Sequence, residues 1–186
     1  MPSMIQLMDA DVTLRPFQIK DSTQLYQAIH ESYMELKPWM SWAREDYTEL
    51  TAREYITITR ARWEERTLFA FAITRNDEIL GGCTLSSIHP IYHFCNMGYW
   101  VRTSCHGQGI AGRAARLAAR FGFENVGLIR AEIVVAVENK ASMRVAEKIG
   151  AHYEGMLLNR MVVGKSIYDA HMYSLLPSDF GLVARL

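Results

Sequence analysis

Along the 186-residue chain, short continuous apolar runs alternate with segments whose apolar residues recur at helical spacing. Short, nearly continuous apolar runs predict β-strands. These runs cover residues 12–17, 68–74, 78–88, 93–101, 129–137, 153–163 and 166–176. A strand, a helix and another strand follow one another in the middle of the chain, so a parallel pair is expected among mostly antiparallel neighbours. The pattern therefore predicts a mixed α/β fold with a sheet of about seven strands flanked by helices.

Start and stop signals place four helices between these strands. Asp21 is expected to cap the first helix. The sequence Thr-Ala-Arg-Glu at 51–54 has the form of a capping box and is expected to open the second. The third begins after Gly109. The fourth is expected to have Asn139 as its N-cap and Gly150 directly after its end.

Composition and charge narrow the function classes. The 20 basic and 20 acidic residues cancel, which argues against nucleic-acid binding through a basic surface. The apolar runs are too short to cross a membrane, and the first twelve residues do not resemble a secretory signal. The three cysteines have no Cys-x-x-Cys spacing and predict reduced thiols. We therefore expect one domain, residues 1–186, in the cytoplasm, binding neither nucleic acid nor membrane.

The helix that follows Gly109 begins with arginines and has no acidic residue in its first turns. A helix N-terminus already carries partial positive charge, so Arg113 and Arg116 are unfavourable there unless an anion is bound. Gly107 and Gly109 allow turns that direct several backbone N–H groups to one point, as phosphate sites do. No Walker sequence follows. The pattern predicts a phosphate or pyrophosphate site, with a glycine turn beside a solvated basic face as the alternative.

Three stretches resemble the GNAT acyltransferase superfamily, and within it the ribosomal-protein N-alpha-acetyltransferases of the RimJ/RimL type. They are GYWVRTSCHGQGIAGRAA (98–115), ENKASMRVAEKIGA (138–151) and EGMLLNRMVVGKSIYDAHMYSLL (154–176). The family's phosphate motif is Gln/Arg-x-x-Gly-x-Gly/Ala, and this chain departs from it by having His106 at the first position. The resemblance implies the GNAT fold with a splayed central strand pair, and acetyl-CoA as cosubstrate.

The resemblance also implies where acetyl-CoA binds. Its pyrophosphate would contact the turn and the helix start, formed by His106, Gly107, Gln108, Gly109, Ile110, Ala111, Gly112 and Arg113. Strand 98–101 would diverge from strand 132–137. Backbone groups of Tyr99, Trp100 and Val101 would then pair with the pantetheine arm as an added strand does. Asn139 and Ser142 would complete the cofactor contacts.

Direct acetyl transfer to an amine needs a neutral amine, a polarised carbonyl and a stabilised leaving thiolate. By resemblance, Ser142 would serve the leaving thiol. The alternative is that Ser142 is an ordinary residue of the first helical turn that satisfies a backbone N–H group. Tyr168 and Tyr173 are further candidates for the acid, although tyrosines on a C-terminal strand commonly belong to the core.

No general base is evident in the sequence. Asn96 and Met161 stand where related enzymes carry a glutamate. The remaining candidates for the base are Glu132 and a relay through water. An α-amino group has a pKa of about 7.7–8.0 against about 10.4 for lysine, so it depends less on a base. The acceptor expected is an α-amine of a protein N-terminus or small amino compound. It would be approached past Trp39 or Trp42, unless these tryptophans belong to the core.

Other interpretations stay open. Cys105 beside His106 could form a thiol nucleophile, and His89, His93 and Cys95 could bind zinc. Adjacency in a loop argues against the first and the hairpin position against the second, so no metal is expected. The chain could also be a non-catalytic acetyl-CoA-binding module, a nucleotide-binding protein, or an enzyme for a small amine such as an antibiotic or polyamine. The partner expected is the amine acceptor, and a homodimer is left open.

Overall fold

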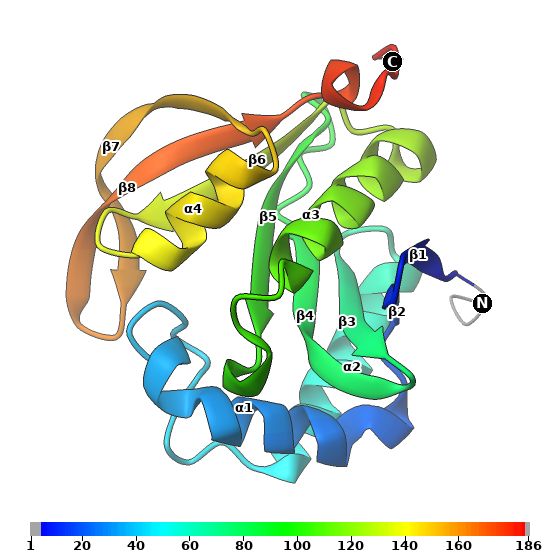
Figure 1. The fold of residues 1–186 in the computed structure, drawn as a ribbon, viewed down its shortest axis with the longest axis vertical. Helices are drawn as coiled ribbons and strands as arrows, with labels where there is room; N and C mark the ends of the chain where they lie inside the picture. The colour runs from blue at the N-terminus through cyan, green and yellow to red at the C-terminus, as the bar shows by residue number, and fades with distance from the viewer. Residues whose placement is uncertain (1–4, 185–186) are drawn as a thin grey trace.

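The computed structural model describes residues 5–184 and contains an eight-stranded sheet with four α-helices (Figure 1). The strands are β1 (Leu7–Asp9), β2 (Val12–Pro16), β3 (Phe69–Arg75), β4 (Glu78–Ser86), β5 (Phe94–Val101), β6 (Arg130–Ala136), β7 (His152–Val163) and β8 (Ser166–Leu175). The helices are α1 (Ser22–Leu36), α2 (Glu49–Glu64), α3 (Ile110–Phe121) and α4 (Lys140–Lys148). The mixed α/β fold and the expected element order are confirmed. The additional strand β1 is too short for an apolar pattern to predict.

The two central strands of the sheet separate after a short parallel contact. The strand order is β1-β2-β3-β4-β5-β6-β8-β7. Strands β5 and β6 pair in parallel at three positions, Phe94–Arg130, Cys95–Ala131 and Asn96–Glu132. Beyond Asn96, β5 continues along β4, whereas β6 continues along β8. The expected divergence of strand 98–101 from strand 132–137 is confirmed.

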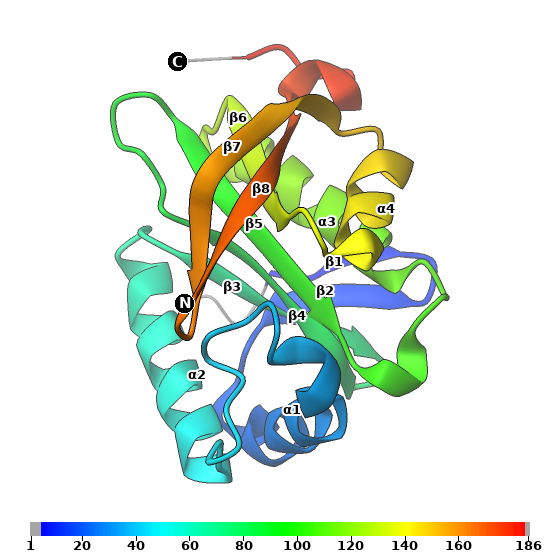
Figure 2. The same ribbon diagram turned by 90° about the vertical axis from the view of Figure 1, so that its left-hand side faces the viewer.

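Alternating side chains give the sheet two hydrophobic faces. Phe71 and Ile73 of β3 belong to the larger core cluster, which includes the buried face of α3. Ala70 and Ala72 of the same strand belong to a smaller cluster with residues of α1 and α2. Figure 2 shows α1 and α2 together on one side of the sheet, with α3 and α4 beyond it. The sheet therefore lies between the two helix pairs, and a ligand could bind on either of its faces.

The start of α2 differs from its prediction, whereas α1 begins directly after Asp21, as predicted, but without a capping hydrogen bond from the Asp21 side chain. Helix α2 begins at Glu49, because the extended residue Thr48 accepts a hydrogen bond from the Thr51 backbone N–H at 3.2 Å. The predicted capping box at 51–54 therefore lies inside the helix. Asp21 precedes α1, but its carboxylate accepts from Arg15 at 2.6 Å and from the Gln18 N–H at 2.8 Å. It binds the strand before the helix, so its side chain does not cap α1.

The boundaries predicted for α4 are confirmed. Asn139 Oδ1 accepts a hydrogen bond from the Ser142 N–H at 3.1 Å, as an N-cap does. Gly150 follows the C-terminal end with φ of +79°, a conformation that favours glycine. These contacts fix the first turn of α4, which carries Ser142.

Candidate active site

A glycine turn connects β5 to the N-terminus of α3. Gly107 and Gly109 have φ values of +77° and +72°, so both positions favour glycine for backbone reasons. Gly109 is the N-cap of α3, and its side-chain position would face open space. The turn predicted from the sequence is confirmed. Its function as a pyrophosphate site stays a prediction.

The arginines of α3 have protein partners, which corrects one step of the sequence argument. Arg113 donates to Asp11 Oδ1 at 2.6 Å, although Asp11 lies 102 residues earlier in the chain. Asp11 also pairs with Arg75 at 2.6 Å, and the hydrogen bond from Arg113 lowers the pKa of the Asp11 carboxyl. Arg116 donates to the carbonyls of Ile149 and Asp179 at 2.8 and 3.3 Å. The absence of local acids therefore does not require a bound anion, and the glycine turn is what remains in support of one.

His106 connects the turn to its neighbours. Its Nε2 lies 2.9 Å from the carbonyl oxygen of Val101, and its Nδ1 lies 3.1 Å from a carboxylate oxygen of Glu35 on α1. The residue that departs from the family motif thus contacts the end of β5. Its ring is engaged on both nitrogens.

Backbone register decides which groups of β5 face the gap beside β6. The Arg102 N–H donates to the Leu80 carbonyl at 2.7 Å, so alternate residues of β5 pair their backbone with β4. Trp100 is one of these, and Tyr99 and Val101 direct their backbone groups away from β4. This register favours Tyr99 and Val101 over Trp100 for backbone contact with pantetheine, and the role expected of Trp100 stays a prediction. The Val101 carbonyl is contacted by His106, which leaves Tyr99 as the main candidate.

Ser142 and Tyr99 are in contact beside this gap. Ser142 Oγ donates to Tyr99 Oη at 3.3 Å, and Tyr99 Oη donates to the Ser142 carbonyl at 3.3 Å. Burial raises the pKa of Tyr99 to about 12. The phenol is therefore neutral at physiological pH and holds the first turn of α4 against β5. The sequence did not predict this pair.

Glu132 lies at the last parallel pair, opposite Asn96. Its carboxylate accepts from Arg130 Nε at 2.8 Å, and Arg130 also pairs with Glu154. The Arg130 guanidinium lowers the pKa of Glu154 to about 2. Through Arg130, Glu132 takes part in a group of ion pairs that connects β6 to Glu154 on β7. A catalytic role for it stays a prediction.

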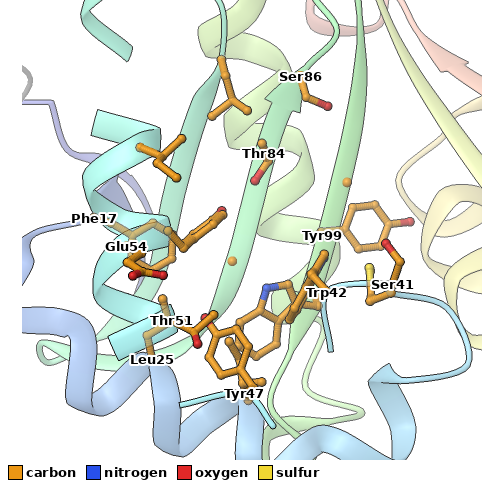
Figure 3. Close-up of a pocket in the computed structure, with 18 of the residues that line it drawn as sticks. Phe17, Leu25, Ser41, Trp42, Tyr47, Thr51, Glu54, Thr84, Ser86 and Tyr99 are labelled. Atoms are coloured by element: carbon orange, nitrogen blue, oxygen red, sulfur yellow. The ribbon is translucent and has the colours of Figure 1, made fainter. Parts of the chain in front are cut away.

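A cavity of about 670 Å³ opens on the other face of β5, between α1, α2 and the strands β4 and β5. Figure 3 shows Phe17 and Glu54 on one side of it and Tyr99 on the opposite side. Trp42 lines the cavity. Trp39 does not belong to its lining, and its ring centroid lies 6.2 Å from that of Tyr168 on β8. The two predicted acceptor residues thus have different surroundings.

Sequence reasoning missed the contribution of α2 to this cavity. Thr51, Glu54, Tyr55 and Ile58 line it, and their spacing places them on one helix face. That spacing is the signal that could have identified them. Glu54 is the acidic residue among the lining residues, and the sequence analysis did not consider it.

The remaining candidates have ordinary environments. Tyr173 is buried in the larger core cluster. The hydrogen-bond contact of the Cys105 thiol is Ser104 at 3.9 Å, whereas the His106 ring contacts Val101 and Glu35. His89 accepts from the backbone of its own loop.

Between residues 5 and 184, no group of three or more histidine, cysteine, aspartate or glutamate side chains could hold a metal ion. No helix in the same part of the chain combines the length and apolar character of a membrane span.

Known proteins are similar to this chain in sequence and in fold. The chain is 25% identical over 150 residues to the ribosomal-protein-serine acetyltransferase of Escherichia coli, covering 81% of this chain and 84% of that one. It is 24% identical to the spermidine N(1)-acetyltransferase of Escherichia coli over 159 residues, 86% and 82% of the two chains. The structure of RimL, a ribosomal alpha-N-protein acetyltransferase in complex with coenzyme A, has a TM-score of 0.86. It is 20% identical and covers 92% of this chain and 98% of that one.

A family model also matches most of the chain. The model described as an acetyltransferase (GNAT) domain matches residues 11–152, which include the glycine turn, β5, β6 and all of α4. The chain therefore belongs to the GNAT acetyltransferase family, as an N-acetyltransferase that uses acetyl-CoA.

Proposed function

We propose that this enzyme transfers the acetyl group directly to an α-amino group, of a protein N-terminus or of a small amino compound. The observation that carries the proposal is the position of Tyr99. This residue lines the cavity beside α1 and α2, and its hydroxyl contacts Ser142 near the gap between β5 and β6. An amine in the cavity and a thioester in the gap would meet at this residue.

The chemistry assigns a role to each group around the meeting point. The pyrophosphate of acetyl-CoA would accept hydrogen bonds from backbone N–H groups of residues 108–112 at the start of α3. The amine nitrogen attacks the thioester carbonyl carbon, and the carbon–sulfur bond breaks. The proton that the amine nitrogen loses is carried by water, and the leaving thiolate takes up one proton to become the thiol. Ser142 Oγ would turn its proton from Tyr99 Oη to the departing sulfur, and Tyr99 would keep the first turn of α4 in place through its hydrogen bond to the Ser142 carbonyl.

The acceptor class follows from the carboxylates near the site. Glu132 is paired with Arg130, and Glu54 lies at the exposed wall of the cavity. At a pH of about 7.5, about a quarter to two-fifths of an α-amine is neutral, against about a thousandth of a lysine side chain. A site without a free buried base suits the amine that needs less deprotonation. The relatives named for a ribosomal-protein serine and for spermidine span protein and small-molecule acceptors.

The test is a peptide with a free N-terminus and one internal lysine, with the modified nitrogen located by mass spectrometry. Acetylation is expected at the α-amine, with kcat/KM levelling off above a pH of about 8 as that amine becomes neutral. Modification mainly at lysine, with a rate that rises steeply above a pH of about 9, would reject the proposal. Direct transfer predicts that Cys105→Ser stays active and that no acetyl-enzyme accumulates.

Three further assignments accompany this proposal. The described strands belong to one sheet, which supports a single catalytic domain over residues 1–186. The edge strand β7 exposes Met156, Leu158 and Val162, which favours a homodimer and is tested by sedimentation. Cys83, Cys95 and Cys105 are free thiols, as expected for a cytoplasmic protein.

A further inference from the structure

We propose that the acceptor carries a bulky apolar or aromatic group within a few bonds of its amine, and that the cavity between α1, α2 and the β4–β5 strands holds this group. This inference rests on the proposed function, since it takes the cavity as the acceptor site. It goes further by naming the property of the acceptor that the enzyme selects.

Aromatic rings form much of the cavity wall. The ring of Trp42 lies 5.9 Å from that of Trp100 and 6.5 Å from that of Tyr47, with interplanar angles of 57° and 59°. Tyr55 lies at the other side, with its ring 5.9 Å from Phe17 in an edge arrangement. All five residues line the cavity. Tilted rings of this kind favour contact with apolar or aromatic groups.

The cavity extends to the smaller hydrophobic core. Phe17 and Leu25 line it and retain only 2% and 1% of their exposed surface. These side chains form an apolar end of the cavity, where a polar substituent would find no hydrogen-bond partner in them. A group that reached this end would be removed from water, as in other small-molecule sites.

The absence of a side chain at Gly98 deepens the cavity. Gly98 lines the cavity, and a Cβ added there would have no atom within 4 Å. Its neighbours on the same face of β5, Asn96 and Trp100, carry large side chains. The recess at Gly98 is therefore open space in the fold that a substrate group can fill. Its backbone does not require glycine, because its φ lies outside the positive region.

The charge of the lining argues against a polycation. Glu54 and Arg44 are the acidic and the basic side chain among the described lining residues. One carboxylate suits one ammonium group, and Arg44, whose Nε pairs with Asp46 at 3.3 Å, offers no negative charge for a second. Thr84 and Ser86 of β4 add hydroxyl groups along the floor. The lining therefore fits a monoamine with an apolar body, in contrast to the acceptor named for the spermidine relative.

The test measures kcat/KM for peptides that differ in the first residue, glycine, serine, leucine, phenylalanine or tryptophan, together with phenethylamine and spermidine. The wild type is expected to prefer phenylalanine over glycine by about 10-fold or more, since each apolar group in a fitted pocket contributes about that factor. The peptide and phenethylamine arms distinguish an N-terminus from a small amine. A preference for phenylalanine over glycine peptides, or for phenethylamine over spermidine, supports the inference.

Two variants connect the preference to the cavity. Gly98→Val fills the recess and should reduce kcat/KM for phenylalanine peptides far more than for glycine peptides, with the acetyl-CoA affinity unchanged by calorimetry. If Gly98→Val does not fold, Trp42→Ala measures the same property. Trp42→Ala should lower the phenylalanine-to-glycine ratio, whereas the matched variant Trp39→Ala should keep it, because Trp39 does not line the cavity.

The outcomes separate the inference from the proposed function. A wild-type preference for glycine or serine N-termini, or for spermidine, overturns the inference, and the first of these leaves α-amine acetylation in place. An unchanged phenylalanine-to-glycine ratio in both folded variants also overturns it. Acetylation of lysine in place of the N-terminus would instead reject the proposed function.

Discussion

At the residue scale, the hydroxyl of Tyr99 connects two parts of the site that are separate in the sequence. It accepts a hydrogen bond from Ser142 Oγ and donates one to the Ser142 carbonyl. The pair holds a helix start on one side of β5, while Tyr99 also borders the proposed acceptor cavity. Because burial raises the Tyr99 pKa to about 12, the phenol keeps its proton across the working pH range.

Removing either hydroxyl should affect the chemical step more than binding. Ser142→Ala is expected to lower kcat by about 10- to 100-fold with little change in KM for acetyl-CoA, because its bond to sulfur strengthens as the thiolate forms. Tyr99→Phe should lower kcat less, since it only loosens the position of Ser142. The double variant should lose no more than Ser142→Ala alone. Steady-state kinetics of the three variants decide this, and wild-type kcat in Ser142→Ala would return Ser142 to a structural role.

At the scale of elements, α1 holds the segment that leads from β5 into the glycine turn. Glu31 accepts from the Ser104 N–H at 2.9 Å and from Arg102 Nε at 3.0 Å. Ser32 Oγ accepts from the Thr103 N–H at 3.0 Å. The helix thus fixes the backbone of residues 102–104 before the turn begins, and Leu25 of the same helix lines the proposed acceptor cavity.

This contact gives the fold an acid-sensitive element. The hydrogen bond from Arg102 lowers the pKa of Glu31 from 4.5 to about 2. A carboxyl with a depressed folded-state pKa stabilises the fold above its unfolded value and loses that contribution as the pH falls through the folded value. Part of the wild-type stability should therefore disappear between pH 4.5 and about 2. Glu31→Gln should be less stable than the wild type near neutral pH, and the two melting temperatures should converge in acid. Parallel melting curves at every pH would contradict this assignment.

Prediction from the sequence succeeded where the determining contacts are local. The Asn139 cap and Gly150 act within a few residues, so residue type and spacing identify both. It failed for Arg113, because Asp11 reaches it from the β1–β2 turn, 102 residues earlier. The start of α2 was misplaced because Thr48 provides the same capping chemistry as Thr51, three residues sooner.

At the scale of the whole molecule, the candidate site exists only through the tertiary fold. The cavity takes residues from α1, α2, β4, β5 and the segment between α1 and α2, and the Ser142 contact comes from α4. The family resemblance supplied the cosubstrate and the divergent strands. The spacing of Thr51, Glu54, Tyr55 and Ile58 marks one face of α2. The cavity itself could not be predicted, because no local pattern specifies which strand lies opposite that face.

The short contact between β5 and β6 has a mechanical consequence. Three residue pairs join an arm formed by β1–β5 to an arm formed by β6, β8 and β7. We expect the packing at this joint to affect the angle between the arms, together with contacts such as that of Arg116 with the Ile149 carbonyl. This angle would set the width of the space that would receive acetyl-CoA. Ala131 is fully buried there, opposite Cys95.

Enlarging the joint should therefore change an affinity at a distance. Ala131→Val adds volume to close packing, which costs about 1–3 kcal/mol and moves the surrounding backbone. The Kd for acetyl-CoA should rise several-fold by calorimetry, although residue 131 lies outside the glycine turn and the acceptor cavity. A folded variant with an unchanged Kd would mean that the angle between the arms is fixed elsewhere. On this view, the affinity of the enzyme for its cosubstrate depends on the angle at which the two arms of the sheet are joined.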